Sequence, residues 1–219
     1  KNMEEVRTNF DGITYAKGAS VLQQLVAHVG KENFFAGLKK YFAKHAWGNT
    51  ELRDLLVELE ATSGRDLTAW TKTWLQTAGV NTFRPNLKIN DGKYEEVAII
   101  QEAPLVPEGS KELRPHRMAV GLFDVKNGKL ERRKSVELDV AGARTVVDGL
   151  KGEAVADLLL INDHDLTYGK IRFDERSIQT LKAHLGDLTD SLTRALCWSA
   201  AWDMHRDGEL SATDYSEMV

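Results

Sequence analysis

The 219-residue sequence has little cysteine and proline and lacks a long apolar run. Its single cysteine, Cys197, excludes an intrachain disulfide and any zinc site built from several cysteines, which fits a reducing compartment. No apolar run approaches the roughly 20 residues that a membrane-spanning helix needs, and the stretch from Lys1 to Glu5 is not a signal peptide. We therefore expect a cytoplasmic protein with no membrane partner. Because position 1 is not methionine, we also expect a fragment or a processed chain.

An excess of positive charge is also missing. Lysine and arginine together number 29 against 33 aspartates and glutamates, which gives a formal net charge of -4. A basic field that would attract nucleic-acid backbones or anionic lipid is therefore absent, and we expect neither as a partner. What the chain does have is 42% hydrophobic residues, enough for a sizeable folded core.

Up to about residue 80, the spacing of apolar residues predicts helices. The first helix has a stripe with steps of four and three residues, which we expect to face a core and which ends before Gly30: Tyr15, Ala19, Leu22, Val26 and Val29. Similar spacing predicts a second helix around 34–42 and a third around 52–59, with Asn49 or Thr50 as the N-cap of the third. A fourth helix is expected from Asp66 to Gly79. Its Trp70 and Trp74 lie one turn apart, which predicts that both anchor a core.

From about residue 82, the pattern changes to the alternation that is typical of strands. The turn sequence Asn90-Asp91-Gly92 predicts a hairpin between strands near 87–89 and 97–100. We expect further strands at 118–123, 135–140, 145–147, 158–161 and 170–173. Short strands joined by turns predict a small β-sandwich.

Helical spacing returns after Asp174, which we expect to be an N-cap. Helices, strands and helices thus follow one another in blocks, which predicts an α+β, multidomain architecture. We place the boundaries at 1–81, 82–173 and 174–219. The last block is too short to stand alone, which suggests a truncated helical domain.

The sequence contains no recognisable metal site. None of the six histidines has the His-Glu-x-x-His spacing that places two imidazoles on one face of a helix. The segment from Asn162 to Asp165 holds three possible ligands but is typical of a turn. Residues 203–214 loosely follow a calcium-binding loop, yet His205 would be a poor ligand, so we expect a helix end and a turn around Gly208.

Two further side chains, Cys197 and Tyr15, are candidate reactive groups. Cys197 lies on an apolar helical stripe, which favours a buried and unreactive thiol. Tyr15 also lies on an apolar stripe, and such a tyrosine is usually a core residue with its hydroxyl hydrogen-bonded. A glycine inside a helix, such as Gly18, often has a packing reason, for example the close approach of a ligand.

Residues 13–22 read Ile-Thr-Tyr-Ala-Lys-Gly-Ala-Ser-Val-Leu and resemble the Tyr-x-Lys-Gly-Ala segment of the aminopeptidase N family of gluzincin zinc metallopeptidases. Similar residues follow in the same order at 34–41, 49–55 and 70–79, which in that family are the closing helices of the catalytic domain. The segment 168–174 resembles the family's junction into a C-terminal helical domain, and residues 192–204 are most similar to actinobacterial members.

This resemblance implies a fold for the whole chain. Residues 1–81 would be the helical C-terminal part of a thermolysin-like catalytic domain, and 82–173 the small β-sandwich that follows in many members. Residues 174–219 would begin the C-terminal helical domain.

The resemblance also implies a chemistry. Family members use zinc, held by His-Glu-x-x-His and a second Glu, to hydrolyse N-terminal residues from peptides. By the match, Tyr15 is the catalytic tyrosine that donates a hydrogen bond to the tetrahedral oxyanion. A phenol with a pKa of about 10 stays protonated at neutral pH, and such a donor is worth about 3 to 4 kcal/mol in the transition state.

The family's zinc ligands and its Gly-x-Met-Glu-Asn segment do not occur in this sequence. We therefore expect zinc in the intact parent enzyme and peptides as its substrates, but neither bound zinc nor activity in this chain alone. The alternatives are a non-catalytic interaction module of the same architecture and an unrelated binding protein.

Overall fold

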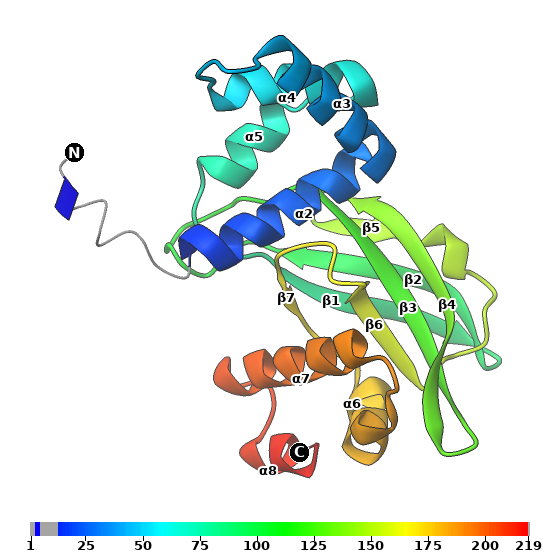
Figure 1. Ribbon diagram of the computed structural model, residues 1–219. Helices are drawn as coiled ribbons and strands as arrows, with labels where there is room; N and C mark the ends of the chain where they lie inside the picture. The colour runs from blue at the N-terminus through cyan, green and yellow to red at the C-terminus, as the bar shows by residue number, and fades with distance from the viewer. Residues whose placement is uncertain (1–2, 5–12, 219) are drawn as a thin grey trace. The chain divides into compact units, whose positions relative to one another are not determined.

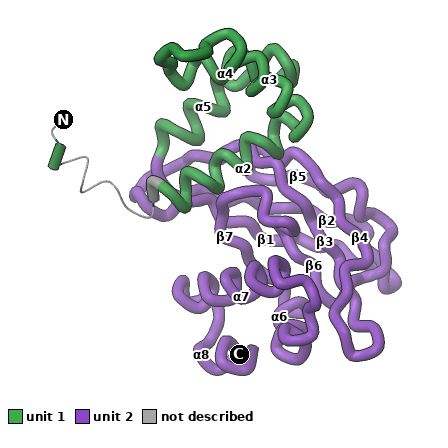
Figure 2. Tube along the Cα trace, viewed as in Figure 1, with its two compact units in different colours: residues 1–77 green, residues 78–219 purple. Residues whose placement is uncertain are grey.

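A computed structural model describes residues 3–4 and 13–218 of the chain (Figure 1). It contains helices and two small sheets, which confirms the α+β fold class. The chain divides into two compact units, unit 1 (Lys1–Thr77) and unit 2 (Ala78–Val219), coloured separately in Figure 2. The three-domain division at 81/82 and 173/174 stays a prediction. None of the helices in the described ranges is long and apolar enough to cross a membrane.

Unit 1 is helical. Its elements are a π-helical turn η1 (Ile13–Lys17) and the helices α2 (Gly18–Val29), α3 (Lys31–Lys44), α4 (Leu52–Ser63) and α5 (Thr68–Leu75). The N-cap of α4 is Glu51, so the expectation of Asn49 or Thr50 was wrong. The reason is a capping box, in which the Glu51 N–H donates to the Asp54 carboxylate at 2.9 Å and the Glu51 side chain accepts in return.

Helices α3 and α4 pack closely because α3 has a glycine at the contact. A Cβ added at Gly37 would lie 2.8 Å from Cδ2 of Leu59 and 3.0 Å from Oγ1 of Thr62. Thr62 also donates to the carbonyl of Asn33 at 2.9 Å, which ties the two helices together. Leu59 is fully buried beneath this contact.

The buried face of α2 differs from the predicted one. Val21, Leu25 and Val29 are buried, whereas Tyr15, Ala19 and Leu22 are exposed. Val21, Leu25 and Val29 are also spaced by four residues, so α2 carries two adjacent apolar stripes and packing covers only one of them. Periodicity alone could not distinguish the two.

The prediction for α5 is confirmed in its core residues. Trp70 and Trp74 are buried and stack with ring centroids 6.0 Å apart. The helix ends at Leu75, however, and Gly79 does not close it. Gly79 has a φ of 90° and lies against the 104–106 segment, where a Cβ would come within 2.4 Å of the Val106 carbonyl oxygen.

Unit 2 contains two sheets, visible in Figure 1. The first has the order β5-β2-β1-β7 and the second β4-β3-β6, built from β1 (Thr82–Asn90), β2 (Lys93–Glu102), β3 (His116–Lys126), β4 (Lys129–Val140), β5 (Arg144–Val146), β6 (Leu158–Asp163) and β7 (Lys170–Ile171). The predicted hairpin is confirmed, since Asn90 pairs with Lys93 across a turn in which Asp91 and Gly92 have positive φ. Strand β7 runs parallel to β1, and the other pairings are antiparallel.

The helices of unit 2 share a core with its strands. They are α6 (Glu175–His184), α7 (Ser191–Arg206) and α8 (Ala212–Glu217), with the 3-10 turns η2 (Asp148–Leu150) and η3 (Leu185–Asp187). Asp174 caps α6 by accepting from the Ser177 N–H at 3.1 Å, as predicted. Helix α6 packs on β6, and α7 packs on β6 and β7. Leu181 and Cys197 therefore join the buried strand residues in a continuous hydrophobic core.

Candidate active site

The candidate catalytic residue Tyr15 lies in η1, the π-helical turn that leads into α2. Its side chain is 63% exposed, so the expectation from spacing alone, a buried core tyrosine, is wrong. Short π-helical segments occur mostly within α-helices and frequently at functional sites, because the wider turn changes the direction of the side chains it carries. Phe10, Asp11 and Gly12, which precede this segment in the sequence, lie outside the described residues.

Tyr15 stands beside an apolar groove of unit 1, which we call the α2 groove. The groove has a volume of about 650 Å³. It is lined by one face of η1 and α2, by the start of α4 and by α5: Tyr15, Lys17, Gly18, Ala19, Val21, Leu22, Leu25, Leu52, Leu55, Leu56, Trp70, Trp74, Leu75 and Thr77. Almost all of these side chains are apolar, so the groove presents an apolar surface rather than charged groups.

Several large apolar side chains that line the groove are exposed in the part of the chain that the structure describes. Leu22 is 54% exposed and Leu52 50% exposed. Beneath them, Trp70 and Trp74 are almost fully buried. At Gly18, an added Cβ would meet nothing within 4 Å, so no close backbone approach explains this glycine. Gly18 instead contributes open space to the groove.

Lys17 brings the one charged group to the groove lining and is half-buried on the same turn as Tyr15. Further from the groove, His28 stacks on Trp70 at 6.4 Å and lies 3.2 Å from Arg65, measured from Nδ1 to Nη1. These contacts fix the Trp70 ring.

The described residues do not fit a zinc ion. Within 3–4 and 13–218, no three histidine, cysteine, aspartate or glutamate side chains come close enough together to hold a metal. Apart from Lys17, the side chains that line the groove with Tyr15 are mainly apolar and include no histidine, aspartate or glutamate.

The other sequence candidates have structural roles. Asn162 accepts from the Thr167 N–H at 3.0 Å and donates to the Thr167 carbonyl at 2.9 Å, which confirms the turn predicted at 162–165. Asp203 and His205 lie within α7, and Gly208 follows with a φ of 79°, which confirms the helix end and turn. Cys197 is fully buried, and desolvation strongly raises the pKa of its thiol, with a smaller contribution from Asp163.

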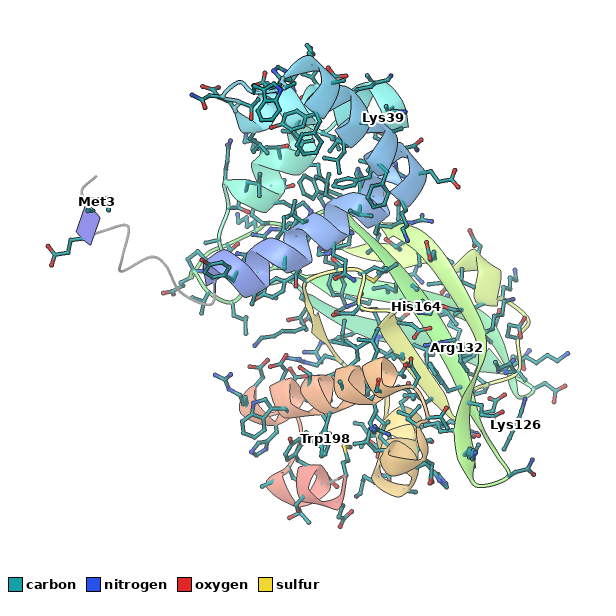
Figure 3. All side chains as sticks on the ribbon, in the orientation of Figure 1. Met3, Lys39, Lys126, Arg132, His164 and Trp198 are labelled. Carbon is teal, nitrogen blue, oxygen red and sulfur yellow. The ribbon has the colours of Figure 1, made fainter. Side chains whose placement is uncertain are left out.

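The carboxylate of Asp163 is the centre of an ion-pair cluster that sequence reasoning missed. It is fully buried and accepts two hydrogen bonds from Arg132, both at 2.8 Å, and one from Ser135 at 3.0 Å. Arg132 also donates to Thr193, at 3.0 Å, and pairs with Asp190, the N-cap of α7. Figure 3 labels Arg132 and the neighbouring His164. This cluster ties the second sheet to the start of α7.

A second cluster ties the other end of α7 to the first sheet. Asp207 accepts from Lys170 at 2.7 Å and also pairs with Arg172, while Glu209 pairs with Arg172 and Arg84. The pKa of Glu209 is lowered, mainly by its hydrogen bond from Arg84. Burial opposes this shift, and a further hydrogen bond from Arg172 adds to it. Burial opposes ionisation of Asp207, but hydrogen bonds from Lys170 and Arg172 outweigh it and lower that pKa as well.

His116 is the most strongly perturbed histidine among the described residues. It is buried at the start of β3, lies edge-on to Phe83 and has its Nδ1 2.7 Å from Oγ1 of Thr167. Desolvation, reinforced by the nearby positive charge of Arg114, lowers its pKa to about 3. The imidazole is therefore neutral in the folded protein at physiological pH.

Both ends of the chain match known protein families. Residues 1–74 match the Peptidase family M1 domain, and residues 158–219 match the ERAP1-like C-terminal domain. The whole chain is 55% identical to an aminopeptidase N of Streptomyces lividans and covers 26% of that protein. The chain belongs to the M1 aminopeptidase family.

Two further similarities are more distant. The chain is 26% identical over its full length to the tricorn protease-interacting factor F2 of Thermoplasma volcanium and covers 25% of it. In structure it resembles an aminopeptidase A of Legionella pneumophila that was crystallised with aspartic acid, with a TM-score of 0.67, 18% identity, and coverage of 97% of this chain and 24% of that one. The chain thus spans about a quarter of the length of these relatives.

The groove residues Leu22, Leu52 and Leu75 were missed as functional candidates because an exposed and a buried leucine look alike in an apolar pattern. Only the second apolar stripe on α2 signalled that this helix has more apolar surface than one core contact uses. The cluster around Asp163 gave no signal, because the hydrogen bonds of Ser135 and Arg132 that build it join residues 28 to 61 positions apart in the sequence.

Proposed function

We propose that the longer protein to which these residues belong is a zinc-dependent aminopeptidase that hydrolyses N-terminal residues from peptides, and that Tyr15 is its oxyanion-stabilising tyrosine. The observation that carries the proposal is the exposed Tyr15 at the rim of an apolar groove, in a π-helical turn. The similarity to aminopeptidases over the whole chain supports it.

This chain contributes a hydrogen-bond donor, the Tyr15 hydroxyl, at the edge of an apolar groove. As the peptide carbonyl becomes tetrahedral, its oxygen gains negative charge, and the Tyr15 hydroxyl donates to that oxygen from a distance of about 2.7 to 3.1 Å. The apolar groove beside Tyr15 lowers the local dielectric on one side of its hydroxyl, which strengthens the bond. Zinc binding and water activation belong to the part of the protein outside this stretch.

The test is Tyr15→Phe in the intact protein, assayed on a fluorogenic amino-acid amide. We expect kcat to fall by about two to three orders of magnitude with little change in KM, because the hydrogen bond forms fully only in the transition state. Zinc content and thermal stability should stay as in the parent. Tyr215→Phe, which removes the hydroxyl of a tyrosine packed against His205 and Trp202 in unit 2, is the matched control and should keep normal turnover.

Two results would count against the proposal. Near-normal turnover of Tyr15→Phe would remove the tyrosine from the mechanism while leaving the enzyme class in place. An intact protein without zinc and without hydrolysis would instead favour a non-catalytic interaction module of the same architecture.

A further inference from the structure

The turn between β3 and β4 is built from an asparagine followed by a glycine. Lys126 pairs with Lys129 across the turn, so Asn127 and Gly128 form a two-residue loop. Both have positive φ, 52° and 74°, as a type I′ hairpin turn requires. All four residues are exposed, and Figure 3 labels Lys126 at the end of the hairpin.

The side-chain amide of Asn127 is open to attack by the backbone nitrogen of the next residue. Among the residues that the structure describes, none forms a hydrogen bond with the Asn127 side chain. The N–H of Gly128 also lies outside the strand ladder, because only the residues that flank a two-residue turn exchange backbone hydrogen bonds. A Cβ added at Gly128 would meet nothing within 4 Å. The nitrogen can therefore approach the amide carbon without losing a hydrogen bond or meeting a neighbouring side chain.

The charges beside the turn favour this attack. Lys126 and Lys129 lie directly opposite each other, and neither forms an ion pair with another described residue. Attack requires that the Gly128 N–H lose its proton, and two nearby positive charges stabilise the resulting anionic nitrogen. Because like charges opposite each other destabilise a strand pair, a carboxylate formed between the two lysines would also be stabilised.

The other asparagines in the described ranges lack one or both of these features. Asn33, Asn81 and Asn162 donate their side-chain amides to carbonyl oxygens at 2.6 to 3.1 Å. The remaining ones precede residues whose side chains hinder the approach of the nitrogen: Asn49, Asn86 and Asn90.

We infer that Asn127 is a site of spontaneous covalent modification, at which the turn between β3 and β4 loses ammonia. The Gly128 nitrogen bonds to the side-chain carbonyl carbon of Asn127 and gives its proton to solvent, and the side-chain nitrogen takes up a proton and leaves as ammonia. Water then opens the five-membered imide at one of its two carbonyls, which gives aspartate or isoaspartate. Water is the only co-reactant.

The isoaspartate product would change the hairpin as well as its charge. Isoaspartate places a side-chain methylene in the main chain, so the loop becomes longer than the strand register allows. The next pair from the turn is Val125 with Leu130, and Leu130 is buried and bridged to Leu188. Modification should therefore loosen the end of the second sheet that meets η3.

Incubation of the intact protein in mildly alkaline buffer tests the site. Peptide mass spectrometry measures the gain of about 1 Da that accompanies loss of the amide. We expect Asn127 to be modified at least about tenfold faster than the exposed controls Asn49, Asn86 and Asn90. Equal rates at these positions would overturn the inference.

The hairpin between β1 and β2 offers a matched turn. Asn90 pairs with Lys93 there, and Asp91 and Gly92 have φ of 48° and 69°. Asp91→Asn places the same dipeptide in the same kind of turn and should create a second site of ammonia loss. Gly128→Ala should slow the modification at position 127 by about tenfold or more, because the new methyl group hinders the nitrogen. An unmodified position 91 in the first variant, or an unchanged rate in the second, would count against the role of the turn.

Hydrogen exchange in the intact protein tests the structural consequence. The isoaspartate form is compared with Asn127→Asp, which has the same charge and a normal main chain. We expect the strand amides next to the turn to exchange about tenfold faster in the isoaspartate form, and Asn127→Asp to behave as the unmodified protein does. Equal exchange in the two forms would refute the loosening of the hairpin. None of these measurements depends on zinc or on hydrolysis, so the result is independent of the proposed function.

Discussion

Arg132 donates from Nε and Nη2 to the two carboxylate oxygens of Asp163, at 2.8 Å each, and this pair lies where the second sheet meets α7. Asp163 is fully buried, and a Cβ on the neighbouring Gly121 would come within 2.6 Å of its Oδ2. The carboxylate thus occupies a site with room for little else.

Arg132→Leu should therefore destabilise the protein by about 3 kcal/mol, because it leaves a buried charge without its main partner. Chemical denaturation of the 219-residue chain measures this loss. Arg117→Leu, which removes a longer and more exposed pair with Glu137 and Asp139, is the control and should cost less than about 1 kcal/mol. Equal losses in the two variants would show that the cluster at Asp163 contributes no more to the free energy of unfolding than an exposed ion pair does.

Gly37→Ala is predicted to destabilise unit 1 although alanine is the better helix former. The new Cβ would lie 2.8 Å from Leu59 and 3.2 Å from the Glu58 carbonyl, so α3 and α4 would have to separate. We expect a net loss of about 1 to 2 kcal/mol, since overpacking exceeds the gain of about 1 kcal/mol in helix propensity. Gly18→Ala, where nothing lies within 4 Å, should be neutral or stabilising in the same chain. The prediction is wrong if both variants shift the unfolding midpoint in the same direction.

Burial of His116 makes stability depend on pH. The unfolded imidazole takes up a proton below about pH 6.5, whereas the folded one stays neutral until about pH 3. The free energy of unfolding should therefore fall as pH falls through this window, with a slope of about 1.4 kcal/mol per pH unit where only this group contributes. Urea titrations between pH 7.5 and 5 measure the slope before the carboxylates protonate.

His116→Gln should flatten this slope, because it removes the buried imidazole. An unchanged slope in His116→Gln would mean that another group carries the pH dependence.

Cys197 should react with a thiol reagent only when unit 2 unfolds. Its sulfur is fully buried and its pKa is raised by desolvation, so both access and thiolate formation are suppressed. We expect the rate of reaction with Ellman's reagent to follow the unfolding rate in water and to rise sharply in urea. Rapid labelling of the native chain would contradict the buried position in α7.

The sequence predicted the order and kind of the elements well where local signals are strong. The hairpin at Asn90-Asp91-Gly92, the cap at Asp174 and the stacked pair Trp70 and Trp74 all depend on contacts within a few residues. The face of α2 that is buried could not be predicted, because two apolar stripes compete and the choice depends on α3, α4 and α5.

The candidate site, too, could be predicted only in part from the sequence. A family resemblance in the sequence pointed to Tyr15, but its exposure and the groove beside it depend on the packing of residues up to 62 positions away, such as Thr77. The ion pairs Arg132–Asp163, Lys170–Asp207 and Arg84–Glu209 join residues 31, 37 and 125 positions apart, a range at which charge patterns in a sequence give no pairing.

Helix α7 is bound at its start to the second sheet through Arg132 and at its end to the first sheet through Lys170 and Arg172. Sliding of one sheet over the other would have to break charged hydrogen bonds at one of these two ends. Strands and helices of unit 2 should therefore move as one rigid body.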